Sequence, residues 1–118
     1  NWTPIDPILS IFVAGFILKS GWLLVKKASH ILMEGTPDAF DVEALKADLI
    51  NQIPDVKDIH HVHVWLLSSD RPLITLHATI DDPNHSPEVL SSLKTRLEDH
   101  WDLGHSTIQI ETGDCADH

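Results

Sequence analysis

The sequence predicts an α+β protein in which one membrane-spanning helix precedes a ferredoxin-like αββαβ domain. Three observations lead to this fold class. An apolar run near the start is long enough to cross a bilayer. The rest of the chain switches between helical and strand periodicity in the order αββαβ. The two parts also differ in charge, because residues 1–33 carry three lysines and one aspartate whereas residues 34–118 carry five basic and 17 acidic residues.

The apolar run extends from Ile8 to Val25 and contains one charged residue, Lys19. Eighteen helical residues span about 27 Å at 1.5 Å per residue, which is close to the thickness of the hydrocarbon core of a bilayer. Lys26 and Lys27 follow directly, so the positive-inside rule places the residues after about 26 in the cytoplasm. A buried core helix is the alternative interpretation of the same run.

The helical pattern continues to Met33 and meets stop signals at Gly35 and Pro37. We therefore expect residues 1–33 to form a membrane helix with a cytoplasmic extension, and residues 34–40 to form a linker. The chain starts without a basic leader or a cleavage site, so a signal peptide explains the run less well. The sequence is expected to be the last part of a longer protein of the cell (inner) membrane.

Residues 41–118 are expected to form one small cytoplasmic domain. Its elements, in order, are a helix capped by Asp41 and ending before Pro54, strands at 59–67 and 73–80 joined by a hairpin connection, a helix at 86–101 and a strand at 106–111. Three strands and two helices in this order form a split βαβ sheet with both helices on one face. The other face of the sheet stays open.

Strand alternation predicts which side chains reach the open face. In the second strand Ile74, Leu76, Ala78 and Ile80 form the buried row, which leaves His77 outward. In the last strand Ile108 and Ile110 point inward, which leaves Glu111 outward. A histidine and a carboxylate on one exposed surface are half of a metal site.

The first strand contains three histidines in four positions. Alternation places His61, His63 and Trp65 on one face, and His60, Val62 and Val64 on the other. A single strand histidine is more often structural than a ligand, and the pattern alone does not choose among His60, His61 and His63.

Composition narrows the class of partner. The formal net charge of −10 and the lack of a basic stripe exclude nucleic acid as a partner, because phosphates would be repelled. Eight of the nine histidines lie between His60 and His118, and imidazole is a common ligand for zinc and its neighbours. The one cysteine, Cys115, excludes an internal disulfide and suits a reducing compartment. Metal cations are the expected partners.

A second group of candidate ligands lies towards the end of the chain. His105 precedes the last strand, and Cys115 and His118 form a C-x-x-H pair. Thiolate and imidazole both suit zinc. A frayed tail with an isolated cysteine is the alternative interpretation.

Four stretches of the chain, in this order, resemble the cation diffusion facilitator family. They are Asp6-Pro7-Ile8, His30-Ile-Leu-Met-Glu-Gly-Thr-Pro37, His60-His-Val-His-Val-Trp65 and Thr107-Ile-Gln-Ile-Glu111. The resemblance covers nearly the whole chain. It implies a proton-coupled exporter of zinc or similar divalent cations that works as a homodimer with six membrane helices. This chain would begin at the sixth helix, so the transport site on the second and fifth helices lies outside it.

Carried over from the resemblance, the cytoplasmic metal ligands are His60, His77 and Glu111. Some relatives have a second site, which would match His105, Cys115 and His118, with His118 in place of a second cysteine. Such donors also accept cobalt, nickel, cadmium or copper, and zinc is the expected cation. The resemblance also suggests regulation, in which metal neutralises two facing acidic domains, draws the dimer together and favours export.

Two other functions compete with export. A stand-alone cytosolic metal-binding or metallochaperone module would bury its first helix. A metal-dependent hydrolase would need an open metal position beside a general base, and no HExxH-like helix pair is present in the sequence. We therefore expect the protein not to be an enzyme.

Overall fold

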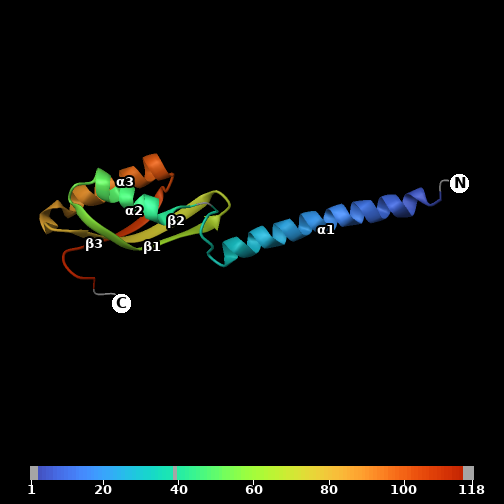
Figure 1. Ribbon diagram of the computed structural model, residues 1–118, viewed down its shortest axis with the longest axis horizontal. Helices are drawn as coiled ribbons and strands as arrows, with labels where there is room; N and C mark the ends of the chain where they lie inside the picture. Colours follow the sequence, from blue (N-terminus) through green and yellow to red (C-terminus); the bar gives the residue numbers. More distant parts are fainter. Residues whose placement is uncertain (1–2, 39, 116–118) are drawn as a thin grey trace. The chain divides into compact units, whose positions relative to one another are not determined.

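The computed structural model describes residues 3–38 and 40–115, and the chain divides into two compact units between Met33 and Glu34 (Figure 1). The first unit is helix α1, Ile5–Leu32, which is about 42 Å long at 1.5 Å per residue. None of its residues is buried, and it is long and apolar enough to cross a membrane. It begins at Ile5, three residues before the apolar run from Ile8 to Val25. Pro7 is tolerated there because the first turn of a helix needs no N–H donor.

The end of α1 differs from the prediction in one detail. The helix ends at Leu32, before the predicted stop at Gly35, and Glu34 has left-handed backbone with φ of 54°. The N–H of Met33 still donates to the carbonyl of Ser29 at 2.9 Å, so the last helical turn is closed before the chain turns away.

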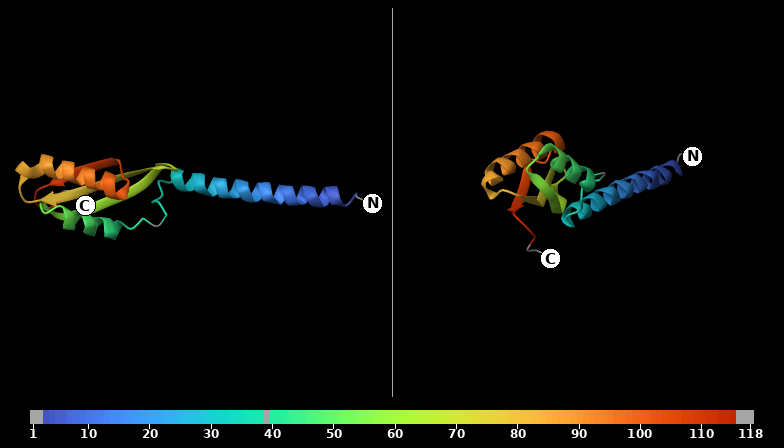
Figure 2. Two further views of the ribbon diagram at one scale, coloured as in Figure 1. Left: turned by 90° about the horizontal axis from the view of Figure 1, so that it is seen from above. Right: turned by 60° about the vertical axis from the view of Figure 1, so that its left-hand side comes forward.

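The second unit is an α+β domain, as predicted. Its elements are α2 (Val42–Gln52), β1 (Val56–Ser68), β2 (Arg71–Ile80), a short 3₁₀ turn η1 (Pro83–His85), α3 (Ser86–Trp101) and β3 (His105–Glu111). The sheet order is β1-β2-β3, with β1 antiparallel and β3 parallel to β2. Figures 1 and 2 show α2 and α3 on the same side of this sheet. The first strand begins at Val56, three residues before the predicted start.

The core lies between the two helices and one face of the sheet. Leu45 and Leu49 of α2 and Leu93 and Leu97 of α3 are fully buried, and they face the buried row of β2, which is Ile74, Leu76, Ala78 and Ile80. The predicted alternation in β2 is therefore confirmed. Every buried core residue lies between Leu45 and Leu103, so residues 34–118 supply their own hydrophobic core.

Local signals fix the ends of both helices. Asp41 caps α2 as predicted, because its carboxylate accepts the N–H of Ala44 at 3.0 Å. Helix α3 ends at Asp102, which has left-handed backbone with φ of 55°. The next N–H, of Leu103, donates to the carbonyl of Leu97 at 2.9 Å, and Leu103 itself is buried. This combination of a left-handed residue and an apolar contact is a common helix C-terminus.

A charged cluster joins the two helices. Asp48 of α2 accepts hydrogen bonds from Arg96 Nη2 at 2.7 Å and Nε at 2.9 Å, and from Trp101 Nε1 at 2.9 Å. The hydrogen bonds from Arg96 lower the pKa of the Asp48 carboxyl to about 2. Both partners lie on α3, so this one carboxylate connects the helices beside the apolar core.

Strand β1 contains a bulge that changes the predicted alternation. His60 pairs with His77 and His63 pairs with Thr75. Between these two pairs β1 has two residues and β2 has one, so β1 carries one extra residue. His61 has φ of 49°, in the left-handed region. Because of this extra residue, His60 and His63 share the open face. The predicted placement of His60 on the face of Val62 and Val64 is therefore wrong.

We predict that Asp48→Asn lowers the free energy of unfolding of residues 34–118 by about 2 kcal/mol at pH 7, because it removes a charge from three hydrogen bonds. The pKa of Asp48 is lower in the folded protein than in the unfolded chain. The contribution of the ionised Asp48 carboxylate to the free energy of unfolding is therefore complete above about pH 4 and is lost as pH falls towards 2. Urea denaturation at several pH values measures both effects. Glu98→Gln, at an exposed position of α3, is the control and should change little. Equal stability of the two variants would contradict the role of Asp48.

A second prediction concerns the bulge. His61→Val should lower the free energy of unfolding by about 1–2 kcal/mol, because a β-branched residue is strained at positive φ. His61→Gly removes the same imidazole without that strain and should be no less stable than the original protein. Chemical denaturation of both variants separates backbone strain from the loss of the side chain. Equal destabilisation by Val and Gly would show that the backbone conformation at position 61 is unimportant.

Candidate metal centre

Four potential metal ligands meet on the open face of the sheet. They are His60 of β1, His77 of β2, Glu111 at the end of β3, and Cys115 four residues later. Each offers one ligand atom, and these four atoms lie within 4.8 Å of one another. All four residues are half-buried. Among the described residues, no other group of three or more histidine, cysteine or acidic side chains meets this test.

Direct contacts link all four side chains. Glu111 Oε2 lies 3.1 Å from His60 Nε2, and Glu111 Oε1 lies 2.9 Å from His77 Nδ1. Cys115 Sγ lies 3.6 Å from Glu111 Oε1 and 3.8 Å from His77 Nδ1. The carboxylate of Glu111 is therefore the centre of the cluster.

The strand register explains why these residues meet. His60 and His77 are direct partners across β1 and β2. Glu111 pairs with Thr79, which is two residues beyond His77 and on the same face of the sheet. The alternation that placed His77 and Glu111 on the open face agrees with the structure. His60 joins them through the bulge at His61.

Neighbouring side chains orient the candidate ligands. Asp58 Oδ2 lies 3.0 Å from His60 Nδ1. When this nitrogen carries the proton and donates it to Asp58, the lone pair of the ring lies on Nε2, towards Glu111. Gln109 Nε2 donates to Glu111 Oε1 at 2.8 Å. Metal-binding imidazoles and carboxylates are typically held by such partners.

The surroundings also favour an ionised Glu111. Burial alone raises the pKa of this carboxyl. The hydrogen bond from Gln109 and the three other side chains of the cluster outweigh burial, so the pKa of Glu111 lies below its ordinary value. A carboxylate must be deprotonated to bind a cation, and here it is held in that state.

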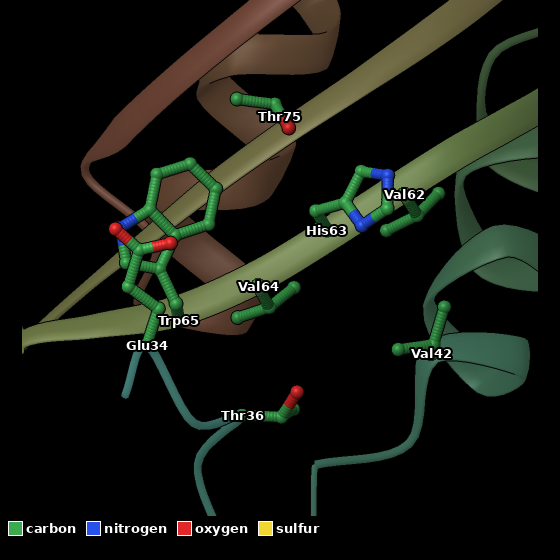
Figure 3. A pocket seen from close by; sticks show the side chains of 8 residues that line it. All are labelled: Glu34, Thr36, Val42, Val62, His63, Val64, Trp65 and Thr75. Carbon is green, nitrogen blue, oxygen red and sulfur yellow. The ribbon is translucent and has the colours of Figure 1, made fainter. Parts of the chain in front are cut away.

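The other two histidines of β1 lie differently. His61 is exposed, and its ring stacks on His77 with centroids 4.9 Å apart. His63 lines a separate cavity of about 440 Å³, in which Figure 3 shows Glu34 and Thr36 facing β1. Of the three alternatives that the sequence left open, only His60 offers a nitrogen to the four-residue cluster.

Two of the three residues expected at a second site, His105 and Cys115, lie apart in the described part of the chain. His105 begins β3 and pairs with Leu73, whereas Glu111 ends it. Six residues of strand separate these positions by about 20 Å. Cys115 lies beside Glu111 and His77, at the far end of β3 from His105. His118 lies outside the described residues.

Sequence reasoning did not place Cys115 in the first cluster. The available signal was its spacing, because Cys115 follows Glu111 by four residues and Gly113 lies between them. Gly113 has φ of 107°, a conformation that other residues rarely adopt. Two imidazoles, one carboxylate and one thiolate form a donor set typical of zinc and similar cations.

Comparisons with known proteins place the chain in a family. The family described as "Cation efflux protein, cytoplasmic domain" matches residues 37–113. The zinc transporter ZitB of Pectobacterium atrosepticum is 45% identical over 117 residues, which are 99% of this chain and 36% of that protein. A cadmium, cobalt and zinc/H(+)-K(+) antiporter of Bacillus subtilis is 38% identical over 118 residues, with 95% of this chain and 36% of that protein covered. The chain thus spans about a third of the length of these relatives.

Solved structures agree on the fold of the second unit. The metal-bound C-terminal domain of the CzcD transporter from Cupriavidus metallidurans is 36% identical, with a TM-score of 0.55. The match covers 61% of this chain and 99% of that one, so the solved structure consists almost wholly of the shared domain. The structure described as "Mode of Action of a Putative Zinc Transporter CzrB", at 18% identity and a TM-score of 0.58, shares the fold and matches 68% of this chain and 100% of that one.

The resemblance drawn from the sequence motifs is confirmed, and the chain belongs to the cation efflux family, the cation diffusion facilitators.

Proposed function

We propose that the chain is the last membrane helix and the cytoplasmic domain of a proton-coupled exporter of divalent cations, chiefly zinc. Family membership and the zinc transporters among its relatives support the choice of cation. The Bacillus subtilis relative is named a cadmium, cobalt and zinc/H(+)-K(+) antiporter, and this name supports the coupling of export to protons. Transport requires the rest of the protein, because the chain spans about a third of its relatives.

The proposed organisation has three parts. Residues 1–33 form the last membrane helix and its extension, residues 34–40 a linker, and residues 41–118 the cytoplasmic metal-binding domain. The length and exposure of α1 support the first part, with Lys26 and Lys27 marking its cytoplasmic end in the cell (inner) membrane. The family match to a cytoplasmic domain over 37–113 supports the third.

The domain is proposed to bind zinc through His60, His77 and Glu111. The observation that carries this proposal is the convergence of these three side chains from three strands, with Asp58 and Gln109 orienting them. The CzcD domain, which shares this fold, is metal-bound. Metal bound here serves regulation, and no catalytic role is proposed for it.

Charge links metal binding to assembly. Residues 34–118 carry 17 acidic and five basic residues, so two copies repel each other at neutral pH. A divalent cation bound to each copy reduces this repulsion and favours a homodimer. In the whole transporter the same step biases the membrane helices towards export, because metal binds the closed dimer more tightly.

The membrane role of α1 gives one prediction. Leu18→Arg should weaken insertion of the full chain by about 3 kcal/mol, because arginine is costly near the middle of a spanning helix. Leu18→Phe keeps an apolar side chain there and is the control. The measurement is the fraction of protein that stays with membranes after alkaline extraction. If the arginine variant is retained as well as the control, the helix does not span the membrane, and the stand-alone metal-binding module becomes the better interpretation.

The metal site gives another prediction. Titration calorimetry on residues 34–118 should detect a zinc-binding event that His77→Ala combined with Glu111→Ala weakens at least about 100-fold. Loss of residues that only orient the ligands typically lowers metal affinity by about 10–100-fold, so loss of two ligands should lower it at least as much. His105→Ala, at the opposite end of β3, should titrate like the original protein. Acid should release the metal, because only the neutral imidazole binds.

Sedimentation of the same samples should show a zinc-dependent dimer for the original protein and for His105→Ala. The double variant should not form this dimer. Zinc binding by the double variant with unchanged affinity would show that the site is assigned to the wrong residues.

A further inference from the structure

The segment after β3 turns back to bring a thiol to the proposed zinc site. Strand β3 ends at Glu111, the described tail leaves the sheet on the side opposite the helices (Figure 1), and Cys115 lies four residues on. Gly113 adopts φ of 107° within this turn, where a side chain would be strained. The thiol then lies 3.6 Å from Glu111 Oε1 and 3.8 Å from His77 Nδ1.

We infer that Cys115 is the fourth ligand of this site and sets its preference for softer divalent cations. The inference rests on the proposed zinc site and adds to it a residue that decides which cations bind tightly. Two imidazoles and a carboxylate alone leave the fourth position to water. Carboxylate and water oxygens suit hard cations such as Mn²⁺. A thiolate in that position favours Zn²⁺, Co²⁺ and Cd²⁺.

The distances support a four-ligand site. Tetrahedral zinc has ligand bonds of about 2.0–2.3 Å, which places its ligand atoms about 3.3–3.8 Å apart. The two distances from Cys115 Sγ already lie at that separation. Glu111 contacts the two imidazoles through different oxygens, with Oε2 at 3.1 Å from His60 Nε2 and Oε1 at 2.9 Å from His77 Nδ1. One ligand atom from each of the four residues lies within 4.8 Å of the others, so small side-chain movements would bring them to the separation that zinc needs.

The chemistry of the thiol is consistent with this role. A cysteine thiol beside a cation loses its proton and binds as thiolate, so metal binding should release one more proton with Cys115 present than without it. The thiolate therefore forms when the cation arrives.

Cobalt provides a direct test. Residues 34–118 loaded with Co²⁺ under reducing conditions should show a near-ultraviolet thiolate-to-cobalt charge-transfer band. Cys115→Ser should still bind Co²⁺ but should lose this band. In competition experiments the same variant should bind Cd²⁺ at least about tenfold more weakly, with a much smaller change for Mn²⁺.

The turn itself supplies a second pair of variants. Gly113→Val should weaken the charge-transfer band, because the valine disfavours the backbone conformation that returns the thiol to the site. Thr112→Val, one residue earlier and free of that constraint, should keep the band.

Three results would overturn the inference. If Co²⁺ binds the original protein without a charge-transfer band, Cys115 is not a ligand, although the zinc site stands. An unchanged preference between Cd²⁺ and Mn²⁺ in Cys115→Ser removes the role in selectivity. If no Co²⁺ or Zn²⁺ binds at all, the zinc site itself is wrong and this inference falls with it.

Discussion

The pairing register of the three strands determines most of what this domain can do. The helices α2 and α3 cover one face of the sheet, and the apolar row of β2 fills the space beneath them. The other face receives every second side chain of β2 and β3, including His77 and Glu111. One register therefore builds the core and the candidate metal site together. A shift of one residue would exchange their side chains.

The sequence was informative wherever one local rule decided the outcome. The caps, the helix faces and the alternation of β2 and β3 follow from residues within a few positions of each other, and Asp41, His77 and Glu111 were placed correctly. His60 was not, because alternation assumes two-residue periodicity and His61 breaks it with a left-handed backbone. Nothing in a run of histidines and valines marks where such a bulge falls.

Cys115 shows a different limit of sequence reasoning. Its distance along the chain from Glu111 was visible, but the direction of the returning segment depends on backbone angles at Gly113. A glycine permits that turn without requiring it. Similarly, Gly35 was the expected end of the first helix, and the helix ends at Leu32 with Glu34 in the left-handed conformation. Both cases concern short connections, where several backbone paths have similar energies.

The bulge at His61 also affects how relatives of this chain should be compared. Deletion of this one residue would leave the histidine content of the strand almost unchanged, and an overall identity score would hardly register it. The deletion would restore strict alternation, because His60 would still pair with His77 and His63 with Thr75, and both histidines would stay on the open face. A one-residue gap at this point of an alignment would therefore leave the position of His60 unchanged, whereas a β-branched residue at position 61 would strain a chain that keeps the bulge.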